Sequence, residues 1–143
     1  MTDVPQALRL GAKASYTKTI TDKDVVEFAR LSGDDQAVHL DSEHAADTRF
    51  ERRIVHGAIL VGMVSAVLGH VMADPDHTII FLGQTSRFIK PAYLDDTVTV
   101  TCEVTRVRED KPVVTMSCTA TNQDGVVLMT GETTAFVDPH PYA

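Results

Sequence analysis

The chain of 143 residues contains no tryptophan and only two cysteines. Two cysteines cannot supply the disulfide framework of a small secreted domain. We interpret Cys102 and Cys118 as free thiols in a reducing compartment, although their positions alone do not exclude a bridge. Positive charge is also scarce, because 13 basic residues stand against 20 acidic ones and give a formal net charge of -7. This balance argues against a protein that coats nucleic acid or an anionic membrane surface.

The sequence also lacks a long uncharged hydrophobic segment. The longest apolar stretch, residues 57–72, would span about 24 Å as a helix and falls short of the roughly 20 residues that a bilayer requires. Residues 1–10 include Asp3 and Pro5 and lack the basic start and apolar run of a secretory signal. We therefore expect a cytoplasmic protein. Its ordinary content of 43% apolar and 23% charged residues predicts a single domain over residues 1–143.

Helical and strand-like periods occupy different parts of the chain. Thr21 predicts a helix N-cap, the helix should end at Gly33, and Asp41 can cap a second short helix after a polar, irregular stretch. Alternating, β-branched or aromatic residues indicate five strands, at 13–20, 78–89, 97–104, 114–121 and 126–137. Gly83 lies inside one of them and predicts a bulge or bend. Short polar turns between the last four strands predict an antiparallel meander.

Residues 57–72 are apolar on nearly every side of the predicted helix. A helix of this kind must be surrounded by other parts of the fold. The order of strand, helices, apolar helix and then four strands is typical of an α+β protein in which a curved antiparallel sheet wraps around one buried helix. This is the hot-dog arrangement. Because such a sheet usually completes itself by pairing with a second copy, we expect a homodimer.

Residues 28–45 resemble the signature of the MaoC-like, or (R)-specific enoyl-CoA hydratase, family. That signature reads aromatic, small-Gly-Asp-x-Asn-Pro-aliphatic-His-x-Asp, and then Ala four residues on. The chain matches it at Ser32, Gly33, Asp34, Val38, His39, Asp41 and Ala45. It departs at Gln36-Ala37, where the signature has Asn-Pro. A second match is Ile54-Val55-His56-Gly57 before the apolar helix, so the resemblance covers nearly the whole chain.

The resemblance implies reversible (R)-specific hydration of short- to medium-chain trans-2-enoyl-CoA to (3R)-hydroxyacyl-CoA, in fatty-acid oxidation or in the supply of polyhydroxyalkanoate precursors. It implies that Asp34 and His39 hold and activate the water. It also implies that Ser65 hydrogen-bonds and orients the aspartate, with Gln36 in place of the supporting asparagine. Stabilising the enolate oxygen needs a hydrogen-bond donor, and the free backbone N–H of Gly57 at a helix N-terminus is our candidate. Which member of the acid/base pair accepts the proton stays open.

Hydration of this kind needs no metal and no cofactor apart from the coenzyme A of the substrate. The remaining histidines lack companions at the usual ligand spacings, and no glycine-rich phosphate loop is present. We interpret His56 as a packing residue at the helix entrance rather than a base. Arg87 and Lys90 are weaker candidates for contacts with the phosphates of coenzyme A.

Two alternative functions follow from the same fold. One is a hot-dog acyl-CoA thioesterase, although residues 57–72 lack the carboxylate that such enzymes often carry on or near the central helix. The other is a non-catalytic module that binds acyl thioesters, although such a module has no need for both Asp34 and His39. The sequence does not decide the acyl-chain length, nor between coenzyme A and acyl-carrier-protein substrates.

Overall fold

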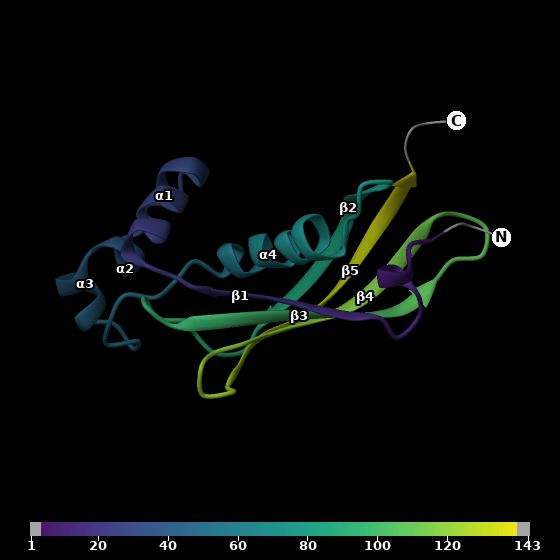
Figure 1. The fold of residues 1–143 in the computed structure, drawn as a ribbon. Coiled ribbons are helices and arrows are strands. Elements are labelled where there is room, and N and C mark those ends of the chain that lie inside the picture. Colours follow the sequence, from purple (N-terminus) through teal and green to yellow (C-terminus); the bar gives the residue numbers. More distant parts are fainter. Residues whose placement is uncertain (1–3, 140–143) are drawn as a thin grey trace.

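The computed structural model describes residues 4–139 and shows one sheet with helices on one side and at one end (Figure 1). The helical elements are η1 (Gln6–Leu8), α1 (Asp22–Ser32), α2 (Ala37–Leu40), α3 (Ser42–Ala46), α4 (Gly57–Ala66) and η2 (Val67–Met72). The strands are β1 (Lys13–Thr19), β2 (His77–Phe88), β3 (Thr97–Val107), β4 (Val113–Thr121) and β5 (Val127–Pro139). All neighbouring strands are antiparallel.

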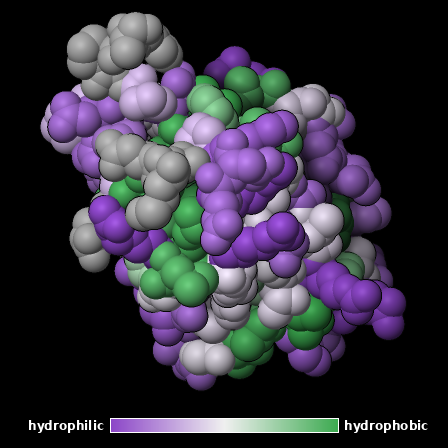
Figure 2. Space-filling model, turned by 90° about the vertical axis from the view of Figure 1, so that its right-hand side faces the viewer, coloured by the Kyte–Doolittle hydropathy of each residue, from purple (hydrophilic) through white to green (hydrophobic). Residues whose placement is uncertain are grey.

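The core lies between α4 with η2 and one face of the sheet. Figure 1 shows α4 lying along the curved sheet, with α1, α2 and α3 gathered beyond one end of it. Alternate residues of β3 and β4 point toward the helix and are buried with its apolar side chains. This confirms the predicted α+β hot-dog fold. At the opposite end of the molecule, small hydrophobic areas are interspersed among hydrophilic side chains (Figure 2).

The sheet order is β1-β3-β4-β5-β2, which corrects the predicted four-strand meander. Strands β3, β4 and β5 do follow one another, but β2 pairs with β5 instead of β3. The reason is that residues 89–96 form no tight turn between β2 and β3. Ile89 donates a backbone hydrogen bond to Leu128, and Tyr93 forms a bridge with Ile54. The predicted irregularity at Gly83 is confirmed by a shift in the β2–β5 register.

The apolar segment 57–72 is helical throughout but changes its winding. It is an α-helix as far as Ala66, and η2 continues it as a π-helix, in which Ala73 N–H donates to the carbonyl of Leu68 at 3.0 Å. The expectation that this helix is surrounded is wrong for the single chain. One stripe of small residues is exposed, namely Ala58, Gly62, Ser65 and Gly69. Within residues 4–139, no helix is long and apolar enough to span a membrane.

Candidate active site

Helix α1 ends where the site begins. Its N-terminus has the predicted cap, a capping box between Thr21 and Asp24, and its C-terminus is Gly33 with a φ of 82°. Glycine adopts this left-handed conformation without the steric cost of a side chain. The turn brings Asp34 next to the last helical turn, where the backbone N–H of Asp34 donates to Ser32 Oγ at 3.1 Å. The aspartate is therefore held at its main chain while its carboxylate extends away from the helix.

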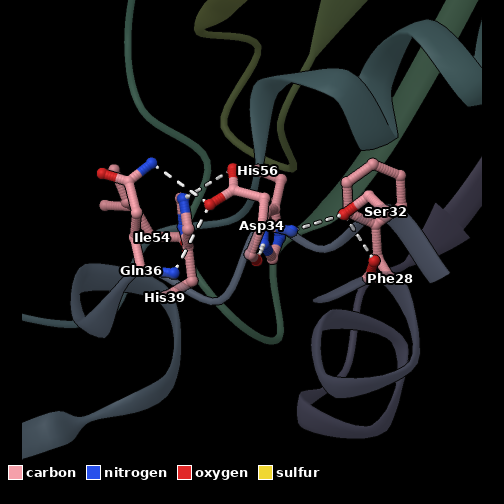
Figure 3. A network of polar contacts seen from close by, with 7 residues as sticks. All are labelled: Phe28, Ser32, Asp34, Gln36, His39, Ile54 and His56. Atoms are coloured by element: carbon pink, nitrogen blue, oxygen red, sulfur yellow. Dashed lines mark hydrogen bonds and ion pairs between the residues drawn. The ribbon is translucent and has the colours of Figure 1, made fainter. Parts of the chain in front are cut away.

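His39 comes from a helical turn that the sequence did not indicate. Residues 33–40 are not wholly irregular, because α2 forms one turn from Ala37. This turn buries His39, and its Nδ1 lies 2.8 Å from the carbonyl oxygen of Ile54. A carbonyl can only accept, so Nδ1 carries a proton, and in the neutral ring Nε2 then has a lone pair. Nε2 lies 3.9 Å from Asp34 Oδ2 (Figure 3).

Gln36 connects the two predicted catalytic residues. Its side-chain amide donates to Asp34 Oδ1 at 3.1 Å, and its backbone N–H donates to the same oxygen at 3.4 Å. These two bonds, the side-chain one foremost, hold the pKa of Asp34 below its ordinary value against a smaller effect of burial. The glutamine side chain, although longer than that of asparagine, thus still binds the aspartate. It binds Oδ1, and Oδ2 is the oxygen nearer to His39.

His56 is part of the same network, whereas the sequence indicated only a packing residue at the helix entrance. Its Nε2 lies 2.9 Å from the main-chain carbonyl of Asp34 and donates to it. Its ring is stacked on His39, with centroids 3.8 Å apart and planes 25° apart. Only the tertiary fold brings these residues together, because 22 positions of chain separate His56 from Asp34. The sequence signal was limited to the position of His56 before Gly57.

Gly57 is the first residue of α4 and borders an apolar cavity of about 460 Å³. The cavity is lined by Phe50, Ile54, Val55, Gly57, Ala58, Leu60, Phe88, Ile89, Lys90, Pro91 and Ala92. A Cβ atom on Gly57 would lie 2.8 Å from Phe88 Cε1, so only glycine allows this approach without movement of the ring. Ile54 connects the cavity with the polar network, because its carbonyl accepts a hydrogen bond from His39 and the residue also lines the cavity.

The structure places the other three predicted site residues, Lys90, Arg87 and Ser65, in different surroundings. Lys90 lines the cavity, as a contact with a bound ligand requires. Arg87 is exposed on β2 next to Phe88 and is absent from the cavity lining. Ser65 is exposed on α4, and within residues 4–139 the hydrogen bonds of Asp34 go to Ser32, Gln36 and His56. The implied bond between Ser65 and Asp34 is therefore not formed in the single chain.

The group most suited to hold a metal ion among the described residues is the network itself. Asp34, His39 and His56 offer ligand atoms within 4.8 Å of one another. A ring nitrogen binds a metal in the plane of its ring at about 2.0–2.1 Å. The two imidazoles lie face to face, so no single point satisfies both rings. The arrangement favours a hydrogen-bonded network around a small polar molecule over a metal site.

Comparisons with known proteins agree with this geometry. The model of the MaoC like domain family matches residues 5–126. The chain is 42% identical over 127 residues to an (R)-specific enoyl-CoA hydratase of Aeromonas caviae, covering 89% of this chain and 93% of that protein. It is 38% identical over 130 residues to an (R)-specific enoyl-CoA hydratase of Rhodospirillum rubrum, covering 91% and 88%.

The fold agrees as well. A solved structure of the (R)-hydratase from A. caviae involved in PHA biosynthesis superposes with a TM-score of 0.86 at 39% identity, covering 92% of this chain and 98% of that chain. The family model, the relatives and the solved structure thus all indicate the same family. The chain belongs to the MaoC-like family.

Proposed function

We propose that this protein is an (R)-specific enoyl-CoA hydratase, a hydro-lyase that adds water reversibly to trans-2-enoyl-CoA and gives (3R)-hydroxyacyl-CoA. The observation that carries the proposal is the placement of Asp34 Oδ2 and His39 Nε2, 3.9 Å apart, with their other polar atoms bound elsewhere. A water molecule about 2.8 Å from each atom fits this separation. The names of the two curated relatives support the same reaction.

The pair can perform both proton transfers of the reaction. The carboxylate of Asp34 and the Nε2 lone pair of His39 both accept hydrogen bonds, so they can hold both O–H groups of one water. As the water oxygen bonds to C3, the pair takes one proton, and the electrons of the double bond move to the thioester oxygen. The pair then returns that proton to C2, which restores the thioester. The atoms balance without a metal or a cofactor, and both additions occur on the face that the pair occupies.

Gly57 supplies the donor for the enolate oxygen in this proposal. Its backbone N–H lies in the first turn of α4, where amide groups have no partner within the helix and the helix dipole is positive. The adjoining cavity is mostly apolar and suits the acyl part of a thioester, with Lys90 available to the phosphates of coenzyme A. Loss of one such donor typically costs about 3–4 kcal/mol in the transition state.

A homodimer completes the fold in this proposal. Both β1 and β2 are edge strands, and β1 carries the polar, lysine-bearing edge that normally prevents pairing. Strand β2 instead exposes Ile80 and Leu82, with exposed fractions of 41% and 56%. The exposed stripe of small residues, which includes Ser65, lies on α4 and η2, and both of these helices contact β2. A second copy that pairs at β2 would cover both surfaces.

A reducing location is part of the proposal. Cys102 and Cys118 are free thiols buried opposite each other on β3 and β4, with their sulfur atoms 3.4 Å apart. Two buried cysteines supply no disulfide framework of the kind that small secreted domains use, which supports the cytoplasm.

The deciding experiment follows the ultraviolet absorbance of crotonyl-CoA with the unmodified protein and with Asp34→Asn. We expect the unmodified protein to consume the enoyl absorbance and to give (3R)-hydroxybutyryl-CoA. An amide cannot exchange a proton at neutral pH, so Asp34→Asn should lower kcat by about 10²–10⁴-fold. Asp35→Asn is the matched control, because Asp35 is exposed one residue further on and should keep the full rate.

Two results would contradict the proposal. A full hydration rate in Asp34→Asn would show that this carboxylate does not move the proton. Release of free coenzyme A instead of hydration would identify a thioesterase.

A further inference from the structure

We propose that His56 is a positioning residue that fixes Asp34 and His39 relative to each other, an inference that rests on the proposed hydration. His56 lies immediately before Gly57 and is 2% exposed. It touches the main chain of one member of the acid/base pair and the side chain of the other. A residue that only packs against the helix entrance would need neither contact.

The first contact fixes the main chain of Asp34. His56 Nε2 donates to the Asp34 carbonyl at 2.9 Å. The N–H of Asp34, which belongs to the preceding peptide group, donates to Ser32 Oγ. The aspartate is thus held by hydrogen bonds at both its N–H and its C=O, so its carboxylate can move only by rotation of the side chain.

The second contact fixes the ring of His39. The two imidazoles stack with their centroids 3.8 Å apart, and the ring of Phe28 packs against His56 at 4.8 Å, tilted by 58°. The stack covers one face of His39, while the bond from Nδ1 to Ile54 fixes its rotation within the plane. Together these contacts orient Nε2 toward Asp34 (Figure 3).

The charge of His56 fits this role. Since Nε2 carries the donated proton, Nδ1 has none in the neutral ring, and Nδ1 is buried without a hydrogen-bond partner among residues 4–139. Burial also lowers the pKa of His56 below its ordinary value. A neutral ring can lie against His39 without repelling a proton that His39 accepts during the reaction, whereas a charged one could not.

Two substitutions separate the two contacts. His56→Phe keeps an aromatic ring for the stack and removes the donor to Asp34. His56→Gln keeps an N–H donor near the position of Nε2 and removes the stack. His44→Gln is the control, because His44 is an exposed histidine of α3 outside the network. Thermal melting of each variant shows whether it folds.

We expect His56→Phe to lower kcat for crotonyl-CoA by about 10- to 100-fold while KM changes less than about threefold, since displacement of catalytic groups by about 1 Å costs up to about 100-fold. His56→Gln should lose less than His56→Phe, because it restores the bond to Asp34. His44→Gln should match the unmodified protein. Folded His56 variants with kcat within about twofold of the unmodified protein, or with a loss confined to KM, would overturn the inference.

A second readout does not depend on hydration. Imidazole ¹⁵N NMR of His39 should show the single tautomer with the proton on Nδ1 in the unmodified protein and a mixture in His56→Gln, which removes the stack that holds the ring. Unchanged His39 signals in that variant would also overturn the inference. If the unmodified protein shows this tautomer but hydrates no enoyl-CoA, the proposed function fails while the positioning of His39 stands.

Discussion

Gln36 favours the ionised form of Asp34, because both of its hydrogen bonds go to Oδ1 of the carboxylate. The pKa of Asp34 in the folded protein is therefore below its ordinary value, with the Gln36 side chain as the main cause. An activity that needs the carboxylate is present above this pKa and is lost as the pH falls through it. Any change that removes the side-chain bond must move that loss to higher pH.

We predict that Gln36→Ala shifts the acid limb of the pH profile of kcat/KM to higher pH. Gln36→Asn serves as the comparison, since it keeps an amide with a shorter reach. The measurement is the hydration rate between about pH 3 and pH 8, a range that includes the ordinary pKa of an aspartate at about 3.9. An acid limb that stays in place in Gln36→Ala would show that Gln36 does not control the ionisation of Asp34.

At the scale of the element, the backbone at the start of α2 has the conformation that proline requires. The family signature has a proline at this position, residue 37. Ala37 is the first residue of α2, a position where proline is well tolerated because its missing N–H has no helical partner. Gln36 has ψ of 139°, in the extended region that a residue before proline requires. The backbone at residues 36 and 37 therefore already suits a proline at position 37.

We predict that Ala37→Pro stabilises the protein by about 0.4–1 kcal/mol, because it restricts the unfolded chain at no cost to the folded one. Urea unfolding measures the difference. The double variant with Gln36→Asn restores the whole signature pair and tests its effect on kcat. Destabilisation by Ala37→Pro would show that the N–H of residue 37 or the conformation of Gln36 matters more than the structure indicates.

The start of α4 offers a second prediction for an element. Gly57→Ala would place a Cβ 2.8 Å from Phe88 Cε1, so the ring must move across the cavity next to the proposed oxyanion donor. We expect a fall in kcat/KM of about 10-fold or more. Phe88→Ala removes the obstacle, so the double variant should be less impaired than the sum of the single effects. Strictly additive losses would show that the two residues act independently.

At the scale of the whole molecule, we expect the unequal edges of the sheet to determine how copies of the proposed dimer associate. We predict that Leu82→Lys, which places a charge at the apolar edge of β2, converts a dimer of twice 15.6 kDa into a monomer. Light scattering after size exclusion measures the mass. Leu10→Lys is the control, because Leu10 is 70% exposed outside the strands. A dimer that persists in Leu82→Lys would place the interface elsewhere.

The local elements could be predicted because each depends on neighbours in the sequence. The cap at Thr21, the end of α1 at Gly33 and the cap at Asp41 are all confirmed, since they are set by hydrogen bonds within a few residues. The turn of α2 was missed because four residues without a capping side chain carry little local signal. The pairing of β2 with β5 was missed because strand order depends on the path of the intervening chain.

The sequence by itself determined the hot-dog architecture, from the contrast between one apolar helix and alternating strands, and it identified Asp34 and His39 through their motif. Only the tertiary structure decided what surrounds them: the Nδ1 proton of His39 directed to Ile54, the stack with His56, and the exposure of Ser65. Sequence motifs and hydrophobic periodicity indicate the local structure of residues that lie within one turn or one strand. Contacts across many residues depend on how those elements pack, which no local pattern encodes.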